Sequence, residues 1–231
     1  MTAPFPSSIR FYSLLAACLL ILPGCGILKD YQAYQANRAE LKAFKAMRKT
    51  WAAEHAAFRS QPGWKKRTYK NEALLKMASP ENVRLEIALS EQRGLLLVSD
   101  SVAMDFAVAT GKRSHPTPAG SFAILSKSRE YASNLYGKIY DATGVVTVAD
   151  ADTTRDTIPE GGWFEGASMP YWMRLTNTGV GLHIGYVPGR PASHGCIRLP
   201  SAVAPVIFQR VRVGTPVVIA DTAPALGSGR N

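Results

Sequence analysis

The sequence predicts a mainly β domain, a sandwich or barrel-like fold with one or few short helices, preceded by an α-helical N-terminal segment. Two changes of pattern along the chain carry this prediction. Apolar residues recur at helical spacing between residues 29 and 59, and after Pro80 their period changes to two. Gly, Pro, Asn and Asp separate the later apolar runs, as is typical of short strands joined by turns.

Residues 1–25 are expected to form a signal peptide. Arg10 precedes an apolar run over residues 11–22, which is shorter than the roughly 20 residues that a membrane span needs. The run ends in Leu-Pro-Gly-Cys, which resembles the lipobox of bacterial lipoproteins, and so indicates lipidation at Cys25. We therefore expect an exported protein on the periplasmic side. Plain cleavage or an uncleaved anchor are the alternatives to lipidation.

The residue after Cys25 bears on the destination of the protein. It is Gly26 and not the aspartate associated with retention in the inner membrane of enteric bacteria. We therefore expect the lipid to anchor the protein in the outer membrane.

Residues 26–80 are expected to form a basic helical tether. They hold 12 Lys or Arg against 4 Asp or Glu, whereas residues 81–231 hold 14 against 13. The chain's net charge of +10 thus belongs mainly to the tether, which argues against nucleic acid as a partner of the C-terminal domain. The helix could lie along anionic lipid headgroups or pack on the main domain. Its apolar stripe comprises Tyr31, Tyr34, Leu41, Phe44, Met47, Trp51, His55 and Phe58.

Residues 81–221 are expected to form the working domain. Alternating residues over 83–89 and 102–108, with the apolar run 95–98 between them, predict short antiparallel strands. Further strands are expected at 171–175, 180–184 and 217–220. A helix is expected over 201–212 with Ser201 as its N-cap, and 222–231 has the composition of a loose tail.

One cysteine, Cys196, is a candidate catalytic residue. If Cys18 leaves with the signal and Cys25 carries lipid, Cys196 is the only thiol of the mature chain. Exported proteins seldom keep an unpaired thiol, so its presence favours catalysis over packing as a small buried hydrophobe. His194 lies two residues before it and His183 lies upstream, and an imidazole can take the proton of a thiol nucleophile.

The neighbours of Cys196 fit acyl chemistry. Gly195 lets backbone amides approach a developing oxyanion, and Arg198 offers a planar fork to a substrate carboxylate or forms a surface ion pair. His183, His194 and Cys196 could alternatively supply three zinc ligands. Since the nucleophile interpretation uses every member of the cluster, we expect no metal and no organic cofactor.

An apparent calcium loop is dismissed on its chemistry. Asp150, Asp152 and Asp156 have the first spacings of such a loop, but Arg155 stands where glycine is needed and Gly161 where glutamate is needed. We interpret this stretch as a solvated loop.

Two segments resemble a known family. Ser193-His194-Gly195-Cys196-Ile197-Arg198 resembles the signature of the L,D-transpeptidase (YkuD-like) catalytic domain of bacterial cell-wall enzymes, with His183-Ile184-Gly185 similar to its upstream histidine segment. Residues 109–111 (Ala-Thr-Gly) and 117–122 (Thr-Pro-Ala-Gly-Ser-Phe) are similar to the family's glycine turn and Thr-Pro-x-Gly-x-Phe segment. The resemblance spans about residues 83–220 and implies a YkuD-like β fold.

The resemblance implies a role for each residue of the site. Cys196 is the acylated nucleophile and His183 the general base, while Ser193 and His194 shape the loop. The amides of Gly195 and Cys196 form the oxyanion hole.

Substrate-binding residues are implied as well. Arg198 orients the motif or binds substrate, and Gly185 supplies the carbonyl that fixes the tautomer of the base. The residues that either line the cleft or belong to the core are Trp163, Met169, Tyr171, Trp172 and Tyr186.

The implied activity is peptidoglycan L,D-transpeptidation. The thiolate would cleave a stem tetrapeptide, release D-alanine, and pass the acyl group to an amine of another stem or to a lysine of an envelope protein. Two rivals stay open. Water in place of the amine makes an L,D-endopeptidase or carboxypeptidase, and a domain without catalysis would be a cell-wall-binding module.

Overall fold

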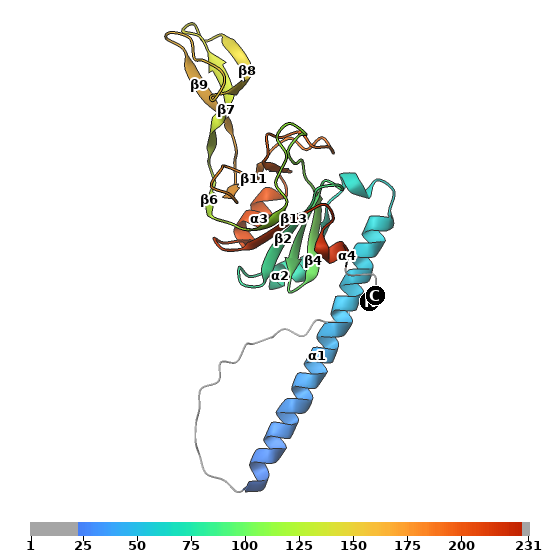
Figure 1. The fold of residues 1–231 in the computed structure, drawn as a ribbon. Helices are drawn as coiled ribbons and strands as arrows, with labels where there is room; N and C mark the ends of the chain where they lie inside the picture. The colour runs from blue at the N-terminus through green and yellow to red at the C-terminus, as the bar shows by residue number, and fades with distance from the viewer. Residues whose placement is uncertain (1–22, 228–231) are drawn as a thin grey trace. The chain divides into compact units, whose positions relative to one another are not determined.

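The computed structural model describes residues 23–227 (Figure 1). The expected signal peptide falls largely on residues 1–22, which lie outside the described residues, as does the side chain of Cys25. Within the described part of the chain, no helix is both long enough and apolar enough to cross a membrane.

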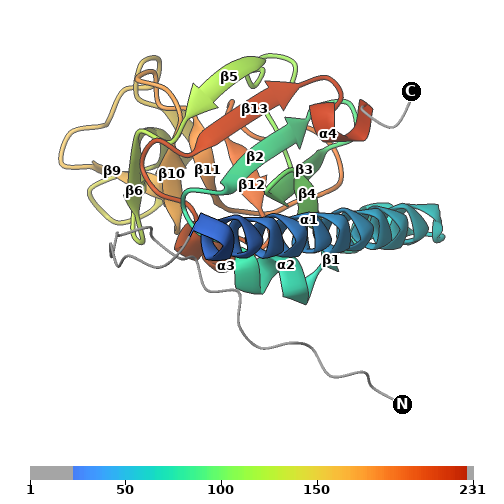
Figure 2. The ribbon, with the colours of Figure 1, turned by 90° about the horizontal axis from the view of Figure 1, so that it is seen from below.

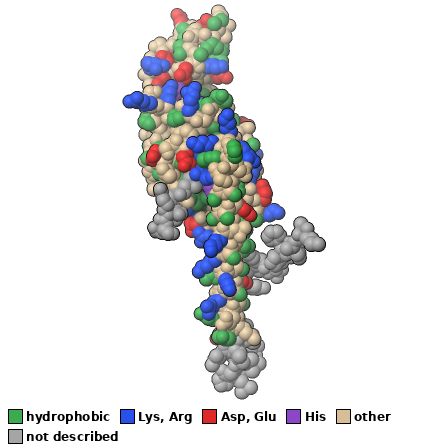
Figure 3. All heavy atoms as spheres, turned by 90° about the vertical axis from the view of Figure 1, so that its right-hand side faces the viewer, with side chains coloured by type: hydrophobic (Ala, Val, Ile, Leu, Met, Phe, Trp, Pro, Cys, Tyr) green, Lys and Arg blue, Asp and Glu red, His purple; other side chains and the backbone are tan. Residues whose placement is uncertain are grey.

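The first element is the long helix α1, Pro23–Ser60, which confirms the helix expected over residues 29–59. Chain contacts divide the protein into two compact units between Met47 and Arg48. In the first unit, Tyr31, Tyr34 and Leu41 are exposed, and Figure 3 shows Lys and Arg side chains along the helix.

Residues 48–80 fold with the β domain. Trp51, His55 and Phe58 recur at helical spacing and are buried, and the ring of Phe58 lies 5.5 Å from that of Tyr69. Of the two possibilities for the apolar stripe, packing on the main domain therefore holds for this second half of α1. The rest of the segment forms a 3₁₀ turn η1 (Trp64–Lys66), strand β1 (Tyr69–Lys70) and helix α2 (Glu72–Met77).

Three sheets make up the β domain, which confirms the mainly β class. The six-stranded sheet has the order β1-β4-β3-β2-β13-β5, and Figure 2 shows β2, β13 and β5 side by side. Besides β1, the strands of this sheet are β2 (Val83–Ala88), β3 (Arg93–Val98), β4 (Ser101–Ala107), β5 (Gly120–Ala123) and β13 (Pro216–Ala220). The four-stranded sheet has the order β12-β11-β10-β6, with β6 Ser126–Ser128, β10 Trp172–Arg174, β11 Gly181–Ile184 and β12 Ile197–Leu199.

The third sheet was not predicted. It contains β7 (Ala132–Tyr140), β8 (Val146–Asp152) and β9 (Trp163–Ser168) in the order β8-β7-β9, and in Figure 1 it extends away from the two larger sheets. Most of its residues are exposed or half-buried, so the strands lack the apolar alternation that reveals a half-buried strand. Asp150 and Asp152 lie in β8, so the solvated loop expected over 150–156 is wrong for its first half.

Strand pairing departs from the antiparallel expectation at two places. The β2-β3-β4 meander is antiparallel as predicted, but β13 pairs with β2 in parallel and β11 pairs with β12 in parallel. A parallel pair needs a long connection, and here residues 185–196 supply it between β11 and β12.

Two local predictions are wrong at the ends of elements. Helix α3 spans Ala204–Arg210 with Val203 as N-cap, because Pro205 occupies the first turn and Ser201 lies in the preceding turn. In the expected loose tail, residues 224–227 form the short helix α4. Ala223 is buried against Ala88, Leu95 and Leu97, and the Ala225 amide donates to Glu86 Oε2 at 2.8 Å.

A buried ionic cluster joins α1 to the six-stranded sheet. Asp105 on β4 is fully buried and accepts hydrogen bonds from Arg93 Nε at 2.7 Å and Arg59 Nε at 2.8 Å, while His55 Nε2 lies 2.8 Å from its second oxygen. Burial alone would raise the pKa of Asp105, but the His55 hydrogen bond and the charges of Arg93 and Arg59 outweigh it and hold the pKa below its ordinary value. Arg93 Nη1 also donates to the carbonyls of Lys65 and Arg67, which fixes the segment after α1.

We predict that Asp105→Asn destabilises the domain by about 3–5 kcal/mol, because the buried Arg93 loses its counter-charge. Asp100→Asn is the matched control, since the side chain of Asp100 is 65% exposed and contributes at most about 1 kcal/mol through its pair with Arg84. Urea unfolding measures both variants. A loss below about 1 kcal/mol for Asp105→Asn would show that the cluster does not hold α1 to the sheet.

Candidate active site

The parallel pair β11 and β12 brings the sequence-predicted residues together. In the register of the pair, His183 lies opposite Arg198 and Leu182 opposite Ile197, and Cys196 directly precedes β12. Paired residues of neighbouring strands share a face, so His183 and Arg198 lie on one face of the sheet, and both line the same cavity as Cys196. Gly185 has a packing reason: a Cβ there would lie 2.8 Å from Cδ and Cγ of Arg198.

The loop before Cys196 is held by residues 109–111. The Thr110 carbonyl accepts from the amides of Ala192 at 2.8 Å and Ser193 at 3.0 Å. Thr110 is held in turn by Gln92, whose side chain donates to its hydroxyl at 2.7 Å and accepts from its amide at 2.9 Å. Gln92 is a positioning residue that no sequence motif indicated.

Ser193 shapes the loop from inside, as the resemblance implies. Its buried hydroxyl donates to the Cys196 carbonyl and accepts from the Gly195 amide at 3.1 Å. The backbone of Gly195 has φ +108°, a region that favours glycine. The Gly195 amide, which was expected to form half of the oxyanion hole, is thus engaged by Ser193 in this conformation.

His183 is oriented by its neighbour along the chain. Nδ1 lies 2.8 Å from the Ile184 carbonyl, which can only accept, so Nδ1 carries the proton and Nε2 keeps a lone pair. The carbonyl expected from Gly185 is thus supplied by Ile184. Burial lowers the pKa of His183 to about 4, helped by the charge of Arg198 and opposed by the Ile184 hydrogen bond.

Cys196 is partly exposed and is a free thiol. Its Sγ donates to the Gly179 carbonyl at 3.5 Å. Burial raises the pKa of the thiol, while the Gly181 amide and the charge of Arg198 act in the opposite direction. With the pKa of one partner raised and that of the other lowered, both side chains are neutral near pH 7.

His194 belongs to a cluster with Tyr136, His115 and Lys112. Its ring stacks on Tyr136 at 4.5 Å and meets His115 edge-on at 4.9 Å, and its Nε2 lies 2.8 Å from Lys112 Nζ. Burial lowers the pKa of His194, and the Lys112 charge adds to the effect. The Nε2 of His194 is therefore occupied by a cation.

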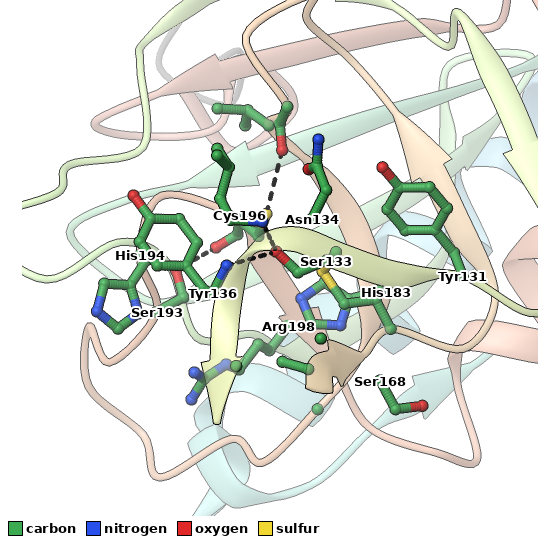
Figure 4. A pocket seen from close by; sticks show the side chains of 18 of the residues that line it. Tyr131, Ser133, Asn134, Tyr136, Ser168, His183, Ser193, His194, Cys196 and Arg198 are labelled. Carbon is green, nitrogen blue, oxygen red and sulfur yellow. Dashed lines mark hydrogen bonds between the residues drawn. The ribbon is translucent and has the colours of Figure 1, made fainter. Parts of the chain in front are cut away.

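These residues open on a cavity of about 660 Å³ (Figure 4). Cys196, His183, His194, Ser193 and Arg198 all line it. The sequence analysis did not identify another part of the cavity lining, which comes mainly from residues 131–138 of β7 and its start. These residues form no recognisable chemical motif, and only the fold brings them to the site. The labelled side chains of that part of the lining are Tyr131, Ser133, Asn134, Tyr136 and Ser168.

The expected cleft aromatics divide into two groups. Met169 and Tyr186 line the cavity, Tyr186 with 78% of its surface exposed. Trp163, Tyr171 and Trp172 do not line it. Trp163 stacks on Tyr140 in the third sheet, and Trp172 is buried, with its ring stacked on Tyr131 at 4.9 Å.

No group of three His, Cys, Asp or Glu side chains between residues 23 and 227 is arranged to hold a metal ion. His183 and His194 point their nitrogens to different partners, the Ile184 carbonyl and Lys112. The Nε2 of His194 thus faces a cation, which does not suit a zinc ligand.

Comparison with known proteins gives one curated relative and several solved structures. The chain is 30% identical over 117 residues to the probable L,D-transpeptidase 3 of Mycobacterium tuberculosis, which is 48% of this chain and 36% of that protein. It thus spans about a third of the relative's length.

The solved structures are more distant. An L,D-transpeptidase from Mycobacterium smegmatis is 21% identical with a TM-score of 0.46, over 60% of this chain and 58% of that one. L,D-transpeptidase 1 of M. tuberculosis is 25% identical with a TM-score of 0.42, over 59% and 60%.

The family model for the L,D-transpeptidase catalytic domain, YkuD, matches residues 82–219. The match covers more than half of the chain and contains the cavity, the loop before Cys196 and all three sheets except β1 and the last residue of β13. It agrees with the span of about 83–220 inferred from the two motifs. The chain belongs to the YkuD L,D-transpeptidase catalytic domain family.

Proposed function

We propose that the chain is a peptidoglycan L,D-transpeptidase with Cys196 as nucleophile and His183 as general base. One observation carries the proposal. A partly exposed thiol and an imidazole, with its tautomer set by the Ile184 carbonyl, line the same cavity. The lone pair that this tautomer leaves on His183 Nε2 is what a general base needs.

The acylation step follows from the neutral pair. His183 Nε2 takes the thiol proton as Sγ bonds to the carbonyl carbon that follows the L-centre of the diamino acid in a stem tetrapeptide. The tetrahedral intermediate collapses, the amide C–N bond breaks, and His183 returns the proton to the leaving D-alanine. The product is a thioester on Cys196.

The second step resolves the thioester. An amine attacks the thioester carbonyl, His183 accepts the amine proton, and the proton passes to the departing sulfur. An amine of a second stem gives a 3-to-3 crosslink, and a lysine of an envelope protein gives protein attachment. Water in the same place gives hydrolysis, so the acceptor alone separates a transpeptidase from an endopeptidase or carboxypeptidase.

Arg198 supports substrate binding in this scheme. Its aliphatic stem packs on Gly185, and no carboxylate of the described residues lies within ion-pair distance of its guanidinium. An unpaired cation at the cavity favours a substrate carboxylate over the surface ion pair. Stem peptides carry such carboxylates. Tyr186, strongly exposed beside the cavity, offers a ring for contact with the same peptide.

We further propose that the protein is exported and anchored to the outer membrane by lipid on Cys25. The proposal rests on the apolar run and lipobox-like end of residues 11–25, followed by Gly26.

Incubation of the protein with purified disaccharide tetrapeptide tests the proposed reaction. We expect D-alanine and a crosslinked dimer from the wild type, none from Cys196→Ala, and a rate reduced about 10²- to 10⁴-fold for His183→Gln. Chromatography with mass spectrometry identifies the products. Tripeptide without dimer would establish hydrolysis, and an unchanged substrate that still binds would establish a wall-binding module.

The pH dependence of thiol alkylation tests the neutral pair. Because the pKa of Cys196 is raised, the thiolate fraction at pH 7 is small, and the rate of iodoacetamide alkylation should rise about tenfold per pH unit beyond pH 8. Mass spectrometry of the Cys196 peptide follows the reaction. A plateau between about pH 5 and 8 would instead reveal a thiolate–imidazolium pair.

Metabolic labelling with a palmitate analogue in a Gram-negative host tests the anchor. We expect label on the wild type and on Cys18→Ala, and none on Cys25→Ala. Density fractionation should place the labelled protein with the outer membrane. An unlabelled wild type would overturn lipidation, and label in the inner membrane would overturn the destination.

A further inference from the structure

We propose that Thr117 is a positioning residue for acyl transfer, because its hydroxyl holds the Gly195 carbonyl and thereby turns the Cys196 amide N–H toward the reacting carbonyl. The inference rests on the proposed function. It assigns a role in the oxyanion site to a side chain 79 positions upstream of the nucleophile, which sequence analysis identified only as part of a motif.

Both hydrogen-bonding capacities of the Thr117 hydroxyl are used. The residue is buried, its Oγ1 accepts from the Gly111 amide at 2.8 Å, and it donates to the Gly195 carbonyl at 2.7 Å. The single hydroxyl proton is thus committed to that carbonyl, which sets the tilt of the peptide between Gly195 and Cys196.

The orientation of that peptide decides where the Cys196 amide points. The chain contains no cis peptide in its described residues, and in a trans peptide the C=O and N–H point in opposite directions. With its carbonyl held on the Thr117 side, the peptide directs the Cys196 N–H away from Thr117. Nothing in the described hydrogen-bond network occupies this amide, whereas the neighbouring Gly195 amide is bound to Ser193 Oγ.

The backbone that positions Thr117 is itself tightly constrained. A Cβ on Gly111 would lie 2.0 Å from the His115 carbonyl oxygen and 2.7 Å from the Thr117 nitrogen, so only glycine allows this close return of the chain. Pro118 restricts the backbone of Thr117 to the extended region, and its β-branched side chain has few rotamers. The glycine turn and the Thr-Pro segment therefore act together as one support for the catalytic peptide.

Two reactions of the same sulfur separate this role from simple support of the loop. A carbapenem acylates the thiolate through a tetrahedral oxyanion, whereas iodoacetamide alkylates it at a saturated carbon and forms no oxyanion. A side chain that only maintained the thiol and its surroundings would affect both rates equally. One that aims an oxyanion donor affects acylation alone.

The test compares Thr117→Val with Thr117→Ser on the full chain, with adducts at Cys196 followed by intact mass and peptide mapping. Losing one oxyanion donor outright costs about 10²- to 10³-fold, so misdirecting it in Thr117→Val should slow acylation about 10- to 100-fold. Alkylation should stay within about twofold, since no oxyanion forms in that reaction. Thr117→Ser keeps the hydroxyl and should restore acylation to within about threefold of the wild type.

Thr215→Val is the matched control. Thr215 is also buried and does not line the cavity, and its Oγ1 likewise accepts from a backbone amide, that of Arg212 at 2.9 Å. Thr215→Val removes that hydrogen bond and should lower Tm, as Thr117→Val should, but it should not slow acylation. If Thr117→Val does not fold, Thr117→Ala provides the same ratio of the two rates.

The outcomes are distinct. Wild-type acylation in Thr117→Val, or an equal fall of acylation and alkylation, overturns the role of Thr117 while leaving the nucleophile in place. A wild type that iodoacetamide alkylates at Cys196 but a carbapenem does not acylate overturns the proposed function and this inference together.

Discussion

The parallel pairing of β11 with β12 is the constraint on which the site depends. It places His183 opposite Arg198 and leaves Cys196 directly before β12. Because parallel neighbours cannot be joined by a tight turn, residues 185–196 must form a long connection, and that connection is the loop that carries Ser193, His194 and Gly195. The geometry of the site is thus a consequence of strand direction, and the hydrogen bonds from Thr110 and Thr117 to the loop fix its details.

Burial sets the electrostatics of that geometry. The same desolvation raises the pKa of the Cys196 thiol and lowers that of His183, and the positive charge of Arg198 lowers both. The result is that both side chains are neutral at rest. A neutral thiol is less open to oxidation than a standing thiolate, which suits Cys196 in an oxidising compartment such as the one we propose.

A second buried cluster serves the fold and lies apart from the cavity. Asp105 pairs with Arg93, Arg59 and His55. The second half of α1 is therefore held to the sheet by ion pairs as well as by the buried side chains of Trp51 and Phe58. The first half of α1 belongs to another compact unit and exposes Arg38, Lys42 and Lys45 at spacings of four and three, that is, on one helical face. One helix therefore combines a segment that is part of the catalytic domain with one that is basic and solvated.

The sequence by itself determined the features that local pattern encodes. These are the helix of α1, the meander of β2, β3 and β4 with its alternating residues, and the family signature around Cys196 with His183 upstream. The third sheet was not predicted, because β7, β8 and β9 bury little apolar surface and therefore show no apolar alternation in the sequence. These strands are stabilised mainly by pairing with one another. The tertiary structure alone decided that Ile184 and not Gly185 orients the imidazole, that Ser193 occupies the Gly195 amide, and that Trp163 lies away from the cavity. Each of these depends on the direction in which a peptide or side chain points after distant strands have packed, and direction in space is not a property that residue type or spacing records.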